Sequence, residues 1–240
     1  HIQQLAGERV EGFLQDPVLI PEKPERNHLP GLHSSLGQRL LASLAIQGED
    51  PLGREPAARA GALLTELAGE AEDQGYRLGA LRAPGRPLRR AVERWRQEYP
   101  WMKEDYFTEE EESEGIAPAA CGLVPVALGM DDTAGLAIRL ARLTHFRSIP
   151  VMAAVAVARV AELLLDEEDG KKLDSQALAR ELISFIEEKE IEYEDTHAPT
   201  WRELGWGRPR AKLSQALAPL PSLLREANDD IAIPTIVKTA

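Results

Sequence analysis

The chain has 240 residues, enough to bury a sizeable core, and its net charge of −12 argues against tight non-specific binding of nucleic acid, which depends on Lys and Arg neutralising phosphates. Hydrophobic residues make up 43% of the chain but aromatic residues only 5%, so Ala, Leu, Val and Ile must fill the core. Because Ala and Leu favour helices while strands favour aromatic and β-branched residues, this composition predicts an all-α protein, and we expect a single domain over residues 1–240.

The N-terminal part of the chain predicts an extended connection followed by three helices. Residues 17–30 contain four prolines and little periodicity, which favours an extended segment. Ser34 and Ser35 can cap a helix whose apolar residues recur at intervals of three and four. A second amphipathic helix is predicted over residues 57–73, and a third begins at Pro87.

Two charged segments follow in this region, and each has two interpretations. The arginine cluster is either a solvated helix face or a site for phosphate or an acidic partner; it comprises Arg82, Arg86, Arg89, Arg90, Arg94 and Arg96. The acidic segment is either a solvated loop or a metal site; it comprises Glu104, Asp105, Glu114 and the run Glu109 to Glu112. For both segments we favour the solvated interpretation.

The centre of the chain predicts two closely spaced helices after a broken segment. Glycine and proline interrupt residues 115–127. Asp131 and Asp132 then cap or begin a helix, where acidic residues suit the helix dipole. The second helix, residues 148–166, is apolar on nearly all sides in its first turns, and a helix of that kind must lie in the middle of the fold.

The C-terminal part predicts one long amphipathic helix and several shorter pieces. The long helix starts near Asp174, and residues 201–209 are aromatic and glycine-rich, which indicates a loop. Residues 213–226 are helical apart from an interruption by two prolines, and residues 231–237 form a short apolar piece. The elements together predict a compact orthogonal assembly of many helices.

The cysteine count and the longest apolar stretch bear on location. The single cysteine, Cys121, cannot form a disulfide within the chain, which suits a reducing compartment, and we expect a cytoplasmic protein. The stretch from Ile149 to Ala158 is too short for a bilayer and is followed by Arg159 and Glu162. It predicts a buried helix rather than a membrane span, so no membrane partner is expected.

The order of the central elements resembles a known family. Residues 115–127, the helix from Asp131, the Thr144-His145 pair and the apolar run to Leu165 resemble the middle of the ADP-ribosylglycohydrolase superfamily, of the dinitrogenase-reductase-activating type. The resemblance implies that family's all-α domain and an ADP-ribose-like nucleotide or an ADP-ribosylated protein as partner. It also implies two Mg²⁺ ions, held by aspartates, which orient the ribose hydroxyls and help activate water.

Four family landmarks can be carried onto this sequence, and three of them are changed. The early Asp-Asp falls on Ser34 and Ser35, and the late aspartate motif falls on residues 227–232, where only Asp229 matches in phase. The Gly-Asn-Gly segment ending in Met-Arg is represented by Gly115, with Ile116 for the Asn and Cys121-Gly122 at the Met-Arg positions. The Thr-His that opens the central helix is kept as Thr144-His145.

The resemblance therefore implies a ligand site with few charged groups and assigns no catalytic residue. Its ligand-binding positions are Ser34, Ser35, Gly115, Ile116, Ala117, Cys121 and His145, and its metal position is Asp229. Mg²⁺ is usually held by carboxylates, whereas serine hydroxyls supply no compensating charge, so we expect the magnesium of the family to be lost. Asp131-Asp132 or the acidic segment could substitute as ligands, but a helix cap is the simpler role for the first pair.

Other side chains also have two interpretations. His145 either faces a ligand or satisfies a backbone group between helices. Cys121 is either a nucleophile or a packed core residue, and no His/Asp partner is implied by spacing. Trp201 and Trp206 either stack an adenine or anchor the core.

Three functions remain open from the sequence. The first, which we favour, is an ADP-ribosylglycohydrolase-like protein with a degenerate di-magnesium site that acts as an inactive homologue or as a binder of an ADP-ribose-like nucleotide. The second is an active hydrolase that cleaves ADP-ribose from a modified protein with ligands at other positions. The third is a helical scaffold or assembly protein without a small ligand.

Overall fold

The computed structural model describes residues 35–46, 55–70, 72, 77–82, 84–97, 117–166, 174–209 and 211–226, and within these ranges the fold is helical, which confirms the all-α prediction. Within the same ranges, one antiparallel hairpin with strands of two residues each accompanies the helices, and Leu78 pairs with Leu81 in it. The elements in chain order are α2 (Ser35–Leu44), α3 (Pro56–Ala68), β1 (Arg77–Leu78), β2 (Leu81–Arg82), α4 (Arg86–Arg96), the 3₁₀ helix η3 (Ala117–Gly122), α6 (Leu123–Ala127), α7 (Thr133–Arg142), α8 (Ser148–Asp166), α9 (Ser175–Glu203), α10 (Leu213–Leu217) and α11 (Leu220–Glu226).

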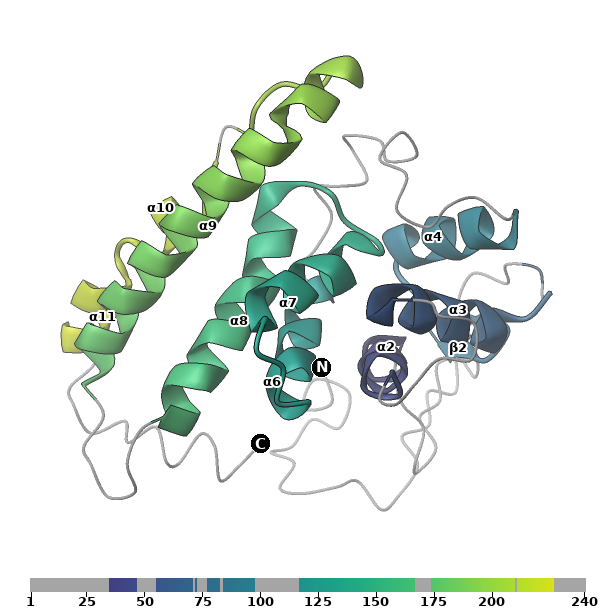
Figure 1. Ribbon diagram of the computed structural model, residues 1–240, viewed down its shortest axis with the longest axis horizontal. Coiled ribbons are helices and arrows are strands. Elements are labelled where there is room, and N and C mark those ends of the chain that lie inside the picture. The colour runs from purple at the N-terminus through teal and green to yellow at the C-terminus, as the bar shows by residue number, and fades with distance from the viewer. Residues whose placement is uncertain are drawn as a thin grey trace, which may run out of the picture.

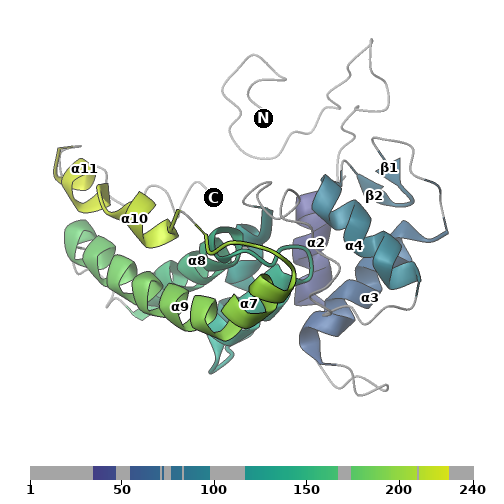
Figure 2. The same cartoon turned by 90° about the horizontal axis from the view of Figure 1, so that it is seen from above.

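Helix α8 lies at the centre of this arrangement (Figure 1). It contacts η3, α6 and α7 towards the N-terminal helices, and α9 and α10 on the other side. Helices α2, α3 and α4 pack on one another beyond α7, and Figure 2 shows the β1–β2 hairpin beside α4 at that end of the molecule. Helices α10 and α11 run along α9 at the opposite end.

The apolar sequence of α8 explains its central place, as the sequence predicted. From Val151 to Val155 every side chain is buried, since a helix that is apolar all round is stable only when neighbours cover every face. By length and composition alone, α8 is also the one helix among the described residues that is long and apolar enough to span a membrane. The core helix of a soluble protein meets the same criterion.

The contact between η3 and α8 is unusually close at Gly122. A Cβ atom added to Gly122 would lie 2.0 Å from the carbonyl oxygen of Ala154. That distance is far inside van der Waals contact, and the obstacle is backbone, which cannot rotate away. Glycine at this position therefore lets the broken segment pack directly on the central helix.

Helix α7 joins two of the core clusters because it is apolar on two faces. On one face Leu136, Leu140 and Leu143 pack with Cys121 and with residues of α2 and α3. On the other face Ala137 and Ala141 pack with α8 and α9. A third cluster joins α2, α3, the hairpin and α4. The N-terminal helices are thus connected to α8 through α7 and η3.

Two element boundaries differ from the prediction. Helix α3 ends at Ala68, earlier than predicted, because Gly69 has a φ of 55° and turns the chain towards the hairpin, which the sequence did not reveal. Helix α9 continues to Glu203, so the loop predicted from Trp201 begins later. Burial of Trp201 stabilises the last turn of α9, so the helix continues past Pro199, which lies inside it. The predicted break near Pro219 separates α10 from α11 and is confirmed.

The close contact at Gly122 generates a first prediction. Replacing Gly122 with Ala should destabilise the protein by about 1–3 kcal/mol, because the added methyl forces η3 away from α8. Chemical denaturation followed by circular dichroism measures this change. Gly207→Ala is the matched control, since a Cβ there would meet no atom within 4 Å. Equal stability of the two variants would contradict the tight approach of η3.

Candidate functional site

A buried arginine connects the start of the described chain to the Thr144-His145 pair. Arg39 of α2 is 3% exposed and donates from Nη1 to Thr144 Oγ1 at 2.7 Å and from Nη2 to the carbonyl oxygen of Leu140 at 2.9 Å. Thr144 Oγ1 lies 2.8 Å from Nδ1 of His145, which is itself 1% exposed. We call Arg39, Leu140, Thr144 and His145 the Arg39 junction.

The junction stabilises the C-terminal end of α7. The last carbonyls of a helix lack partners within the helix, and that end carries a partial negative charge. Arg39 supplies both a donor to the Leu140 carbonyl and a positive charge at this end. Burial of a guanidinium is costly unless its hydrogen-bond capacity is met, and Nε of Arg39 finds no acceptor among the described residues. The protein therefore tolerates a buried positive charge here.

Arg39 lies on the same helix as Ser35, one of the two serines at the positions of the family's early Asp-Asp motif. Ser35 is the first residue of α2, and Arg39 follows it by four residues, so the two lie one turn apart on the same side of the helix. Within the described residues, the Arg39 guanidinium donates to Thr144 Oγ1 and to the Leu140 carbonyl, and both acceptors are uncharged. The positive charge is thus not balanced by an ion pair within the part of the chain that the structure describes.

The other positions expected to bind a ligand or metal are described only in part. Ser34, Gly115, Ile116 and Asp229 lie outside the described residues. For Ser35 and Ala117 the structure gives a place in the backbone, as the first residues of α2 and η3. The assignment of these six residues to a ligand or metal site stays a prediction.

Cys121 and His145 are described fully, and both side chains lie in the interior. Cys121 is 1% exposed and packs in the cluster that contains Val124, Leu136 and Leu140. His145 belongs to the Arg39 junction. His145 has a polar environment and Cys121 an apolar one. Of the two, His145 is the one that the hydrogen bonds of Thr144 connect to Arg39 on α2.

The Asp131-Asp132 pair acts at the start of α7. Asp132 accepts a hydrogen bond at Oδ1 from the amide of Gly135 at 2.8 Å, and its Oδ2 lies 3.7 Å from Arg139. This is the geometry of a helix cap. No group of three or more His, Cys, Asp or Glu side chains that could hold a metal ion is found among the described residues.

The two tryptophans considered for base stacking belong to an aromatic cluster at the C-terminal end of α9. Trp201 is 1% exposed, and its ring lies 6.0 Å from that of Phe146. The guanidinium of Arg147 lies 4.8 Å from the Trp206 ring and 5.5 Å from the Trp201 ring, while its Nη1 donates to the Gly207 carbonyl. A base stacked on Trp206 would compete with this cation–π contact.

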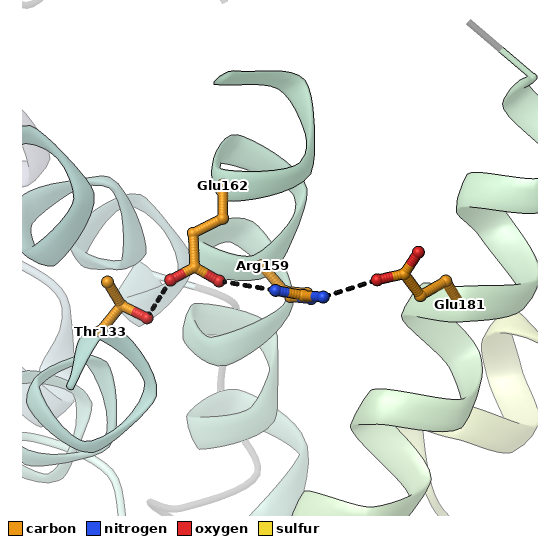
Figure 3. Close-up of polar contacts among 4 residues, drawn as sticks. All are labelled: Thr133, Arg159, Glu162 and Glu181. Atoms are coloured by element: carbon orange, nitrogen blue, oxygen red, sulfur yellow. Dashed lines mark hydrogen bonds and ion pairs between the residues drawn. The ribbon is translucent and has the colours of Figure 1, made fainter. Parts of the chain in front are cut away.

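A polar network ties the three central helices together (Figure 3). Arg159 of α8 donates to Glu181 of α9 at 2.5 Å and to Glu162 at 3.2 Å, and Glu162 also accepts from Thr133 at the start of α7. Burial lowers the pKa of the Arg159 guanidinium, but the hydrogen bonds and charges of Glu181 and Glu162 outweigh it and raise the pKa overall. The network thus links α7, α8 and α9 through side chains.

Comparison with known proteins identifies the family. The family model for ADP-ribosylglycohydrolases matches residues 12–237, which is most of the chain. The chain belongs to the ADP-ribosylglycohydrolase family, and the resemblance seen in its sequence is confirmed. No curated protein and no solved structure was found to match it.

Sequence reasoning missed Arg39, although the sequence carried a signal. The predicted apolar stripe of the first helix includes Leu36 and Leu40, and Arg39 stands between them on the side that also contains Ser35 and Ser43. A charged residue beside an apolar stripe marks either a solvated edge or a buried polar contact. The partner that decides between these, Thr144, is 105 residues away in the chain, so local patterning could not identify it.

The Arg39 junction generates a second prediction. Arg39→Met should destabilise the protein by about 1–3 kcal/mol, because the Leu140 carbonyl is left buried without a donor. Thermal or chemical denaturation measures the effect. Arg202→Met, at an exposed position of α9, is the matched control and should change stability by less than about 0.5 kcal/mol. A stability of Arg39→Met equal to that of the control would show that the junction contributes nothing.

Proposed function

We propose that this member of the family binds an ADP-ribose-like nucleotide without hydrolysing it, because its di-magnesium site is degenerate. The observation that carries the proposal is that serines, Ser34 and Ser35, stand where the resemblance places the family's early aspartates. Asp229 is the one carboxylate in phase with the family's late motif.

The chemistry of the donor set does not fit a pair of magnesium ions. Mg²⁺ gives up its water reluctantly and is held by carboxylates, whose charge offsets the loss of hydration. Two serine hydroxyls and one carboxylate leave most of the charge of two divalent ions uncompensated. We therefore assign no catalytic step to magnesium in this chain.

Arg39 supports the same conclusion from the electrostatic side. Arg39 follows Ser35 by one helical turn along α2, and its buried guanidinium is hydrogen-bonded to uncharged oxygens in the described structure. A fixed positive charge repels a second cation and attracts an anion, and this effect is stronger in a partly buried environment than in water. The field at the start of α2 thus disfavours Mg²⁺ and favours an anionic group such as a diphosphate.

The retained parts of the family pattern support nucleotide binding. Thr144 and His145 are kept, and both are held rigidly by the Arg39 junction. Gly122 keeps the end of η3 against α8, so the start of η3 at Ala117, which adjoins the family's cleft-lining segment, rests on a packed support. A binder needs a preorganised cleft, and these buried contacts can support one from behind, whereas hydrolysis needs the metal ligands in addition.

Binding and turnover measured together test the proposal. Isothermal titration calorimetry should detect ADP-ribose binding to the full chain with the same affinity in Mg²⁺ and in EDTA. Incubation with an ADP-ribosylated protein should release no ADP-ribose in Mg²⁺. Magnesium-dependent release would contradict the proposal and identify an active hydrolase. Absence of both binding and release would contradict it in favour of a scaffold.

Restoring the carboxylates provides the third prediction. Ser34→Asp combined with Ser35→Asp should raise the affinity for Mg²⁺ by at least about tenfold over the native chain, since two anionic donors are returned to the family positions. Titration with Mg²⁺ alone, followed by calorimetry, measures it. Gln215→Asp combined with Ser222→Asp adds the same charge at exposed positions of α10 and α11 and should leave the affinity unchanged. Equal gains in both variants would refute the assignment of Ser34 and Ser35.

A further inference from the structure

An apolar groove runs along the second half of α8. It has a volume of about 370 Å³, and the described residues that line it are all Ala, Leu or Val, from η3, α6, α8, α9 and α10. Leu123 of α6, Ala161 and Leu164 of α8, and Leu213 and Leu217 of α10 are among the residues that line it. A nucleotide needs hydrogen-bond donors for its phosphates, so the groove is not suited to an ADP-ribose-like ligand.

The burial of α8 shows that the groove interrupts its covering. The side chains from Val151 to Val155 are all buried, whereas those from Val160 to Leu164 are half-buried and Leu165 is 73% exposed. The sequence stays apolar throughout this part except for Arg159 and Glu162, which are engaged in the network of Figure 3. Apolar side chains on several faces of a helix require cover on those faces, and the described residues supply it incompletely along the second half of α8.

We propose that residues 231–237 of this chain dock in this groove and complete the covering of α8. The segment reads Ile-Ala-Ile-Pro-Thr-Ile-Val and contains no charged residue, which matches the apolar side chains that the described residues contribute to the groove. It is part of the family domain, because the family match extends to residue 237. The proposal does not depend on whether a nucleotide binds elsewhere.

The chain geometry allows this docking. Helix α10, which lines the groove, is followed directly by α11, and Figure 1 shows these two helices together beside α9. The seven residues of α11 span about 10 Å at the rise of an α-helix. Five Cα–Cα steps separate Glu226 from Ile231, and a stretch of that length can span up to about 16 Å. The tether is therefore long enough to return the segment from the end of α11 to α10.

Other occupants fit less well. Residues 13–20 are also largely apolar, but Asp16 lies in their middle, and burial of its carboxylate against the apolar side chains that the described residues give the groove is costly. Their connection to α2 is also longer, which lowers their effective concentration at the groove. A second copy of the chain would have to overcome repulsion between two bodies of net charge −12.

Disulfide trapping tests the proposal and gives the fourth prediction. In the full chain with Cys121→Ala, the pair Ala161→Cys and Ile233→Cys should form an intramolecular disulfide, detected by mass spectrometry of the non-reduced peptides. The control pair, Leu67→Cys with Ile233→Cys, should not, because Leu67 lies on α3 on the far side of α7 from the groove (Figure 1). Leu164→Cys replaces Ala161→Cys if the first variant fails to fold.

The alternatives have distinct outcomes in the same assay. A disulfide from Ala161→Cys to Val18→Cys in place of Ile233→Cys would overturn the proposal in favour of the N-terminal segment. An intermolecular disulfide would overturn it in favour of a second copy. Trapping no more efficient than in the control pair would also overturn it.

A second measurement uses no cysteine. Ile233→Asp combined with Ile236→Asp should displace the segment, so the fluorescence of an apolar dye such as anilinonaphthalene sulfonate should rise as the groove is uncovered. Asn228→Asp combined with Thr239→Asp adds equal charge on either side of the segment and should give a smaller rise. Equal dye binding by the two variants would contradict the docking. Loss or retention of nucleotide binding is a separate readout and leaves this result unaffected.

Discussion

The close packing of α8 against its neighbours is the constraint on which the rest of the structure depends. Its small side chains allow η3 to approach so closely that only glycine fits at position 122. The contact fixes η3, and through α6 and α7 it fixes the helices at the N-terminal end. Because the interior of a protein is nearly incompressible, a methyl group added at such a contact would displace the elements on both sides of it.

The Arg39 junction is the polar counterpart of this packing. It joins the first described helix to the end of α7 through one guanidinium, and it reaches the Thr144-His145 pair, one of the features on which the sequence resemblance rested. In a hydrolase of this family the neighbourhood would need to attract divalent cations. In the proposed assignment, Ser34 and Ser35 stand near the buried charge of Arg39 at the start of α2, and both features would favour an anion over a divalent cation. The proposed loss of magnesium and the proposed retention of a nucleotide thus have one electrostatic origin.

Sequence patterns predicted the elements that depend on their own residues. They failed for elements whose formation or length depends on contacts with distant parts of the chain. The apolar run of α8 and the prolines after α10 act on their own segments, so these elements were predicted correctly. The hairpin at Leu78 and Leu81 depends on packing against α3, and the continuation of α9 past Pro199 depends on the burial of Trp201. The family match was foreseen from Thr144-His145 and its surroundings, whereas the roles of Ser34, Cys121 and the other site residues stay predictions because pattern alone does not give their geometry.

Hydrogen exchange of the backbone amides tests the central place of α8 most directly. If α8 is the element on which the others pack, the amides of residues 152–158 should exchange only through global unfolding and be the slowest in the chain. Those of α4 and α11, at the two ends of the molecule, should exchange through local opening. Exchange of the α8 amides as fast as those of α11 would contradict the account.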